Sequence, residues 1–104
     1  MSLNRESALQ AIYNAIDELN PQLQEGRQMV AAEDTLVFGE GAPLDSLDLV
    51  NLIMAVEEHI MDLTGDELVL ASESAMSRKR SPYRSVGALA DYAVEVARSV
   101  SADA

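Results

Sequence analysis

The stretch GAPLDSLDLVNLIMAVEEHI, from Gly41 to Ile60, predicts one long helix and through it the class of fold. Gly41 and Pro43 interrupt the chain, and the apolar residues that follow recur at helical spacing. The pattern stops at Thr64-Gly65, because glycine readily adopts the left-handed conformation that follows a helix C-terminus. We therefore expect a helix from about Ser46 to about Leu63.

Two neighbouring residues, Asp45 and Ser46, can each cap this helix, since both side chains can accept a hydrogen bond from a first-turn amide. With Asp45 as the cap, Asp48 partly completes a capping box and the Ser46 hydroxyl projects from the helix tip without a capping role. With Ser46 as the cap, Asp45 only adds a favourable charge at the positive end of the helix dipole. We prefer the first assignment, and the sequence leaves both open.

The apolar residues of this helix form two strips on a helical wheel. One strip is expected to face the core and holds Leu49, Leu52, Ile53, Val56, Ile60 and Leu63. The second lies beyond Ser46 and Glu57 and holds Leu47, Val50, Met54 and Met61. An unpaired carboxylate within a buried face is costly, so Glu57 argues against burial of both strips. We expect the second strip to be an exposed partner surface, with burial of a wider face as the alternative.

Helical patterns also flank this stretch. A first helix, capped by Asn4 or Ser2, should end at Asn20-Pro21, because a residue before proline is disfavoured in the α conformation. Its expected inner positions are Ala8, Leu9, Ala11, Ile12, Ala15, Ile16 and Leu19. A last helix, capped by Ser85, should place Val86, Leu89, Ala90, Ala93, Val96, Ala97 and Val100 on its inner side.

The remaining segments are connections. Residues 22–44 contain scattered apolar residues, which predicts that this long segment wraps the core. The segment after Gly65 should begin extended and then form one short helical turn near Glu73 to Ser77. Residues 101–104 are expected to fray. The whole pattern predicts an all-α bundle of three to four helices in a single domain, 1–104, with its core at about 4–100.

Composition narrows the class of protein. The chain of 104 residues has no cysteine, so disulfides and thiolate metal sites are excluded. The N-terminal residues lack an export signal, and no apolar run approaches the roughly 20 residues that span a bilayer. We therefore expect a cytoplasmic protein that does not insert into membranes, and a monomer.

The charge is concentrated in the middle of the chain. No Lys or Arg occurs between Arg27 and Arg78. The acidic residues of this interval alone account for the net charge of −11, because acids and bases balance in the rest of the chain. Such a surface repels nucleic acid and attracts basic proteins, although acidic residues also serve solubility alone.

The spacing of the polar residues excludes several other kinds of functional site. A serine hydrolase needs a base beside its nucleophile, but His59 is the only histidine and lies on the order of 20 Å along the same helix from Ser46. Asp62 and Glu73 have the separation of a calcium loop, but the ligand pattern between them does not fit. The chain has no glycine motif for phosphate and no metal-ligand cluster.

Two segments resemble the acyl carrier protein family. LDSLDLVNLIMAVEEHI is similar to the region around the modified serine of these proteins, where Asp-Ser-Leu opens a long acidic helix. SVGALADYAVEV resembles their last helix, which often reads Thr-Val-x-x-Leu-x-x-Tyr. The resemblance covers residues 45–60 well and 85–97 moderately, and the first helix matches by pattern only.

This resemblance implies a role for several residues. Ser46 would carry 4′-phosphopantetheine, transferred from coenzyme A, and Asp45 would lie beside the metal that the transferase uses. The thiol of that arm holds acyl groups as thioesters. The positions that correspond to partner contacts are Leu47, Asp48, Val50, Met54, Glu57, Glu58 and Met61. The implied protein is not an enzyme and binds no metal of its own. Its partners would be a phosphopantetheinyl transferase, an acyl- or aminoacyl-loading ligase, and acyl-processing enzymes with basic surfaces.

The sequence departs from the housekeeping carriers of fatty acid synthesis at three places. Leu44 precedes the Asp-Ser pair where those carriers usually have Gly-Ala or similar, and Asn51 stands where they often have glutamate. The segment before the last helix is long and includes the basic run RKRSPYR at 78–84. These differences favour a carrier dedicated to one pathway, such as polyketide synthesis, the modification of a surface polysaccharide or the transfer of an activated amino acid. The alternatives are a peptidyl or aminoacyl carrier, and an acidic helical adaptor without a prosthetic group.

Overall fold

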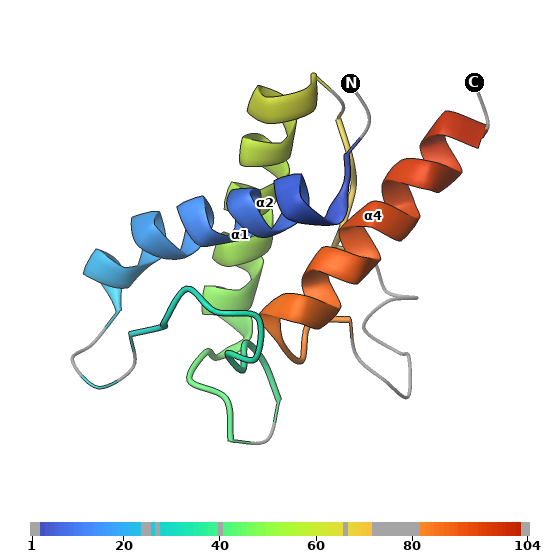
Figure 1. Ribbon diagram of the computed structural model, residues 1–104. Coiled ribbons are helices and arrows are strands. Elements are labelled where there is room, and N and C mark those ends of the chain that lie inside the picture. The colour runs from blue at the N-terminus through green and yellow to red at the C-terminus, as the bar shows by residue number, and fades with distance from the viewer. Residues whose placement is uncertain are drawn as a thin grey trace.

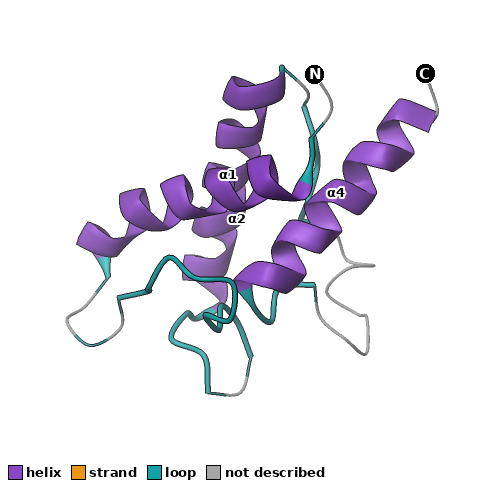
Figure 2. Cartoon of the chain, in the orientation of Figure 1, coloured by secondary structure: helices purple, strands orange, loops and turns teal. Residues whose placement is uncertain are grey.

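The computed structural model describes residues 3–23, 26, 28–39, 41–65, 67–71 and 82–102, with side chains up to Ser99. They form α1 (Arg5–Leu19), the 3-10 turn η1 (Asn20–Gln22), α2 (Ser46–Thr64) and α4 (Val86–Ala102). In Figure 1, α1 crosses α2, and it packs against both α2 and α4. Between these helices run the connections that Figure 2 shows in teal. The predicted all-helical fold is confirmed.

Three further predictions concern the segment after α2, the C-terminal tail and membrane insertion. The turn expected near Glu73 to Ser77, and the basic residues 78–80, lie outside the described residues. The helix α4 continues through Ala102, so the first two residues of the tail that we expect to fray are helical. None of the helices in the described part of the chain combines the length and hydropathy needed to cross a bilayer.

The cap of α1 is Asn4, whose Oδ1 accepts a hydrogen bond from the backbone N–H of Ser7 at 2.8 Å. As predicted, α1 ends at Asn20-Pro21, with Leu19 as its last residue and Asn20 as its C-cap, but not because Asn20 leaves the α conformation. Asn20 keeps a helical conformation (φ −50°, ψ −42°) before Pro21, and the chain leaves the helix only at Leu23. The steric preference against this conformation is overcome because the N–H of Asn20 still bonds to the carbonyl of Ile16.

The long connection does wrap the core, as predicted. Its side chains Leu23, Met29, Val37 and Leu44 are buried. The Asn20 side chain holds its first part: Nδ2 donates to the Met29 carbonyl at 2.9 Å, and Oδ1 accepts from the Met29 N–H at 2.8 Å. This bracket fixes the connection to the end of α1.

Further along, the connection is hydrogen-bonded to the start of α4. An isolated antiparallel bridge joins Leu36 to Ser85, and the N–H of Val37 donates to the Arg84 carbonyl at 3.0 Å. The N–H of Gly87 donates to the Glu33 carbonyl at 2.8 Å. A side chain at Gly87 would press on that carbonyl, with a Cβ only 3.2 Å from the oxygen. The connection therefore lies directly against the first turn of α4.

Arg5 adds a charged link between the same elements. Its guanidinium pairs with Glu33 of the connection, and its Nε lies 2.9 Å from Asp91 Oδ1 of α4. The hydrogen bond to Asp91, which has the larger effect, and the one to Glu33 raise the pKa of Arg5 above its ordinary value. Because both ion pairs are exposed, they orient α1, the connection and α4 relative to one another more than they stabilise the fold.

Residues 67–71 lie beside α2 and add two buried side chains to the core. Leu68 and Leu70 are buried while Val69 is 70% exposed, the alternation expected of an extended segment. Both backbone polar groups of Leu70 bond to side chains. Glu57 Oε2 accepts from its N–H at 2.6 Å, and the buried Tyr83 hydroxyl donates to its carbonyl at 2.5 Å.

We expect Tyr83→Phe to lower the free energy of unfolding by about 1–3 kcal/mol, because the buried Leu70 carbonyl loses its donor. Chemical denaturation measures this change. The matched control is Tyr13→Phe, since Tyr13 is half-buried and its hydroxyl makes no hydrogen bond to another described residue. Equal stability of the two variants would show that the Tyr83 hydroxyl contributes nothing to holding this segment.

Candidate functional site at the start of α2

The start of α2 resolves the choice between its two possible caps. Asp45 is the N-cap, with extended backbone (φ −88°, ψ −178°), and its Oδ1 accepts from the Asp48 N–H at 2.8 Å. Ser46 is the first residue of the helix and is exposed. Its hydroxyl makes no hydrogen bond to another described residue. The preferred assignment, with Asp45 as the cap, is therefore confirmed.

The surroundings of Ser46 suit an anionic group. Amides of the first helical turn point toward the N-terminus, where the helix dipole places positive partial charge. Asp45 occupies the Asp48 amide, but the N–H groups of Ser46 and Leu47 have no partner among the described residues. A phosphodiester on the Ser46 oxygen could therefore lie beside free donors.

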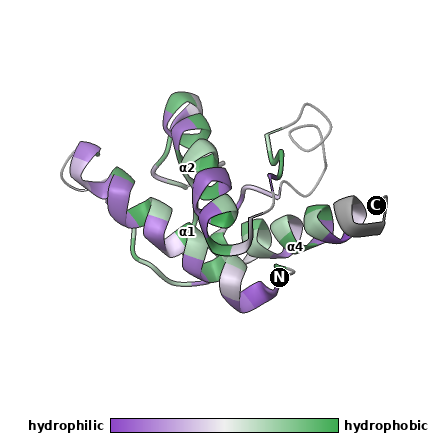
Figure 3. Cartoon of the chain, turned by 90° about the horizontal axis from the view of Figure 1, so that it is seen from above, coloured by the Kyte–Doolittle hydropathy of each residue, from purple (hydrophilic) through white to green (hydrophobic). Residues whose placement is uncertain are grey.

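The two predicted strips of α2 have the expected environments, with one exception. Leu49, Leu52, Ile53, Val56 and Ile60 are buried. Leu63 was expected in the core but is 43% exposed, because the last turn of α2 extends beyond its crossing with α1 (Figure 1). The second strip is exposed, at Leu47, Val50, Met54 and Met61. Figure 3 shows the resulting mixture of hydrophobic and hydrophilic residues along α2.

A groove of about 220 Å³ continues this strip toward residues 67–69. It is lined by Met54, Glu57, Glu58, Met61, Glu67, Leu68 and Val69. The sequence prediction missed Glu67 and Val69 as members of this surface. The alternation in ELVLA could have identified Val69, because an extended segment with Leu68 and Leu70 buried must turn Val69 outward.

The acidic residues predicted as partner contacts are not equivalent. Glu58 is exposed, whereas Glu57 is half-buried and one of its oxygens binds the Leu70 N–H. This explains how a carboxylate is tolerated beside the core. Asp48 is half-buried, and its backbone belongs to the cap. Glu58 therefore offers the freest carboxylate of the three.

The side chain of His59 is only 20% exposed, because it packs toward α1. Its Nε2 lies 3.1 Å from Glu18 Oε1. His59 thus contacts α1, and it is separated from Ser46 by most of the length of α2. In the described part of the chain, no group of three or more His, Cys, Asp or Glu residues is arranged to hold a metal ion.

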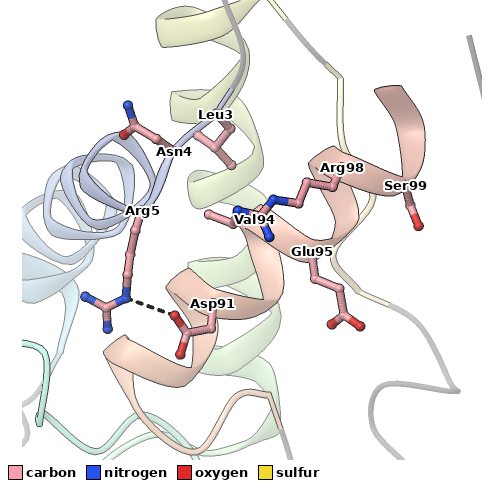
Figure 4. A pocket seen from close by; sticks show the side chains of 8 residues that line it. All are labelled: Leu3, Asn4, Arg5, Asp91, Val94, Glu95, Arg98 and Ser99. Atoms are coloured by element: carbon pink, nitrogen blue, oxygen red, sulfur yellow. Dashed lines mark hydrogen bonds and ion pairs between the residues drawn. The ribbon is translucent and has the colours of Figure 1, made fainter. Parts of the chain in front are cut away.

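A depression larger than the groove beside Val69 lies elsewhere. It measures about 650 Å³ and is lined by residues at the start of α1 and in the second half of α4 (Figure 4). Arg5 and Asp91 line it as a hydrogen-bonded pair (Figure 4), and Arg98 and Glu95 add one charge of each sign. The opposite charges cancel, so the depression favours no ligand of one charge.

Comparison of the chain with protein-family models, curated proteins and solved structures finds no significant match in any of the three.

We expect Asp45→Ala to cost about 0.5–2 kcal/mol of stability, the usual effect of losing an N-cap side chain. The Asp48 amide would lose its 2.8 Å acceptor, while the core would be untouched. Thermal unfolding followed by circular dichroism measures this loss. The more conservative Asp45→Asn should recover most of it, because asparagine also accepts from that amide. Failure of asparagine to do so would assign the loss to charge rather than to capping.

Proposed function

We propose that this protein is a carrier of acyl groups, which are held as thioesters on a 4′-phosphopantetheine arm attached to Ser46. The observation that carries the proposal is that capping and the exposed hydroxyl belong to two different residues at the start of α2. Asp45 caps the helix, and Ser46 is left as an exposed hydroxyl next to amides that have no partner among the described residues. The resemblance of residues 45–60 and 85–97 to acyl carrier proteins supports the same role.

The chemistry fits these groups. A phosphopantetheinyl transferase would join the Ser46 oxygen to the phosphorus next to pantetheine in coenzyme A. The bond from that phosphorus to 3′,5′-ADP breaks, and the hydroxyl proton passes to a base of the transferase. Asp45 would lie beside the metal ion that the transferase brings. The arm supplies the thiol, while this chain supplies position and partner recognition.

The partners follow from the surface beside Ser46. The exposed residues Leu47, Val50 and Met54 offer apolar contacts, and the acidic middle of the chain attracts basic enzymes. These enzymes would be a loading ligase and acyl-processing enzymes. One alternative is an aminoacyl carrier, which would use the same arm. The other is an adaptor without an arm, whose partners would bind the same exposed strip of α2.

The absence of cysteine gives a simple test. The chain contains no thiol of its own, so any thiol that stays with it after loading belongs to the arm. We expect a thiol reagent to find none before incubation and one per chain after incubation with coenzyme A and a broad transferase, once free coenzyme A is removed. A chain that remains without thiol would favour the adaptor.

A further inference from the structure

We infer that Met54 and Met61 form a reversible oxidation site, where a hydroperoxide converts the exposed strip of α2 from an apolar into a polar surface. The strip consists of Leu47, Val50, Met54 and Met61. The inference rests on the proposed function only for its consequence, a slower attachment of the arm at Ser46. The oxidation itself requires neither an arm nor a partner protein.

Exposure distinguishes these two methionines from Met29. Met54 and Met61 are 58% and 49% exposed, whereas Met29 is buried in the core at 6%. Oxidation of a thioether requires contact between the sulfur and the oxidant, so the rate should follow exposure. The chain contains no cysteine, whose thiolate would otherwise react with a peroxide. The exposed methionine sulfurs are therefore the groups of the described chain that a peroxide reaches most readily.

The two methionine side chains share one groove. Met54 and Met61 are seven residues apart on α2, which places them on the same face of the helix and about 10 Å apart along its axis. Both line the groove of about 220 Å³, whose lining also includes Leu68 and Val69. This volume admits hydrogen peroxide, a molecule with only two heavy atoms. One groove therefore gives a small oxidant access to both sulfurs.

The charge of the groove favours a neutral oxidant. Glu57, Glu58 and Glu67 line it, and its described lining contains no Lys or Arg. Such a lining repels anionic oxidants such as peroxynitrite, but it does not repel a neutral hydroperoxide. The sulfur becomes more positive as it attacks the peroxide, and nearby carboxylates favour that charge. The groove therefore selects hydroperoxides as a class.

The reaction needs only the peroxide and, in reverse, a reductase. The sulfur lone pair attacks one peroxide oxygen, and the O–O bond breaks. The sulfur loses two electrons and becomes a sulfoxide, while the peroxide is reduced. The proton of the transferred hydroxyl passes through solvent to the leaving oxygen, which departs as water or, from an organic peroxide, as an alcohol. In the reverse direction, reductase thiols supply two electrons and form a disulfide, and the sulfoxide oxygen leaves as water.

The sulfoxides change what the strip offers to another protein. A sulfoxide is polar, so two of the four residues of the strip no longer provide apolar contacts. Burying a polar group against an enzyme is costly unless the enzyme supplies a hydrogen-bond donor. We therefore expect a transferase to load the oxidised chain at Ser46 about tenfold more slowly. The fold should not change, because both methionines lie outside the core.

The test treats the chain without an arm with hydrogen peroxide, which catalase then removes. Mass mapping of peptides should find sulfoxide at Met54 and Met61 forming about tenfold faster than at Met29, in line with the exposed fractions. Hydrophobic-interaction chromatography reads the polarity of the strip without a partner, and the oxidised chain should elute earlier. Reductases for both sulfoxide epimers should restore the parent retention and the parent rate of loading.

Variants assign the response to these two residues. Met54→Leu with Met61→Leu keeps an apolar strip of similar volume and removes both sulfurs, so peroxide should change neither its retention nor its loading. It keeps the other methionines, and a response that survives in it would contradict the inference. Met54→Gln with Met61→Gln should behave like the oxidised chain before peroxide is added. The matched control, Met29→Leu, should respond to peroxide as the parent chain does.

The outcomes are distinguishable from those of the proposed function. The inference is overturned if Met29 oxidises as fast as the exposed pair, if the reductases do not restore retention, or if the oxidised chain is loaded at the parent rate. A chain that is not loaded even before peroxide is added would refute the carrier role alone. Peptide mapping and retention would then still decide whether Met54 and Met61 are a reversible oxidation site.

Discussion

Ser46→Ala should abolish loading of the phosphopantetheine arm and leave the fold unchanged. The substitution removes the only oxygen that we expect the transferase to modify. The Ser46 hydroxyl has no hydrogen bond to another described residue, and Asp45 retains the cap, so no hydrogen bond between described residues is lost. Alanine is also a good helix former, so α2 should not be weakened. Thiol content measures loading, and circular dichroism measures the fold.

Ser85 provides the matched control for this variant. It stands at the start of α4, where its Oγ accepts from the Ala88 N–H at 3.2 Å. Ser85→Ala should therefore show the reverse behaviour, with normal loading and a loss of roughly 0.5–2 kcal/mol of stability. An unfolded Ser46→Ala variant would mean that Ser46 has a structural duty and that the division between Asp45 and Ser46 is wrong.

Leu52→Ala should destabilise the protein by roughly 2–5 kcal/mol, the largest structural effect that we expect. Leu52 is fully buried on the strip of α2 that faces the core, at 0% exposure, and its removal leaves a cavity between packed elements. Denaturant unfolding measures this loss. In a protein with the usual margin of about 5–15 kcal/mol, it is a large share of the total stability.

The exposed strip supplies the contrast to Leu52. Val50→Ser with Met54→Ser should change stability by only about 0.5 kcal/mol, as surface substitutions usually do. The same pair should slow loading and acylation by partner enzymes, because the apolar contacts beside Ser46 are gone. If the double variant is as unstable as Leu52→Ala, the two strips do not differ in burial and the partner surface lies elsewhere.

Much of the architecture could be predicted from local rules. The start of α2 followed from Pro43 and Asp45, and its end from Gly65, which adopts φ 79°. Caps and breakers act over a few residues, so sequence reasoning captures them. The separation of the two strips of α2 was predictable for the same reason, since it depends only on the helical period.

What the sequence could not predict depends on contacts between distant segments. The pairing of Glu57 with the Leu70 N–H is one example, because it requires residues 67–71 to lie against α2. The packing of His59 against Glu18 and the exposure of Leu63 depend on where α1 crosses α2. The groove beside Val69 combines two such segments, so only the fold could reveal it.

The most direct test of the carrier role is the intact mass of the parent chain after incubation with coenzyme A and a broad phosphopantetheinyl transferase. The proposal predicts a gain of one phosphopantetheinyl group per chain, which fragmentation assigns to the peptide that contains Ser46. An unchanged mass, or a gain located on any other serine, would contradict it.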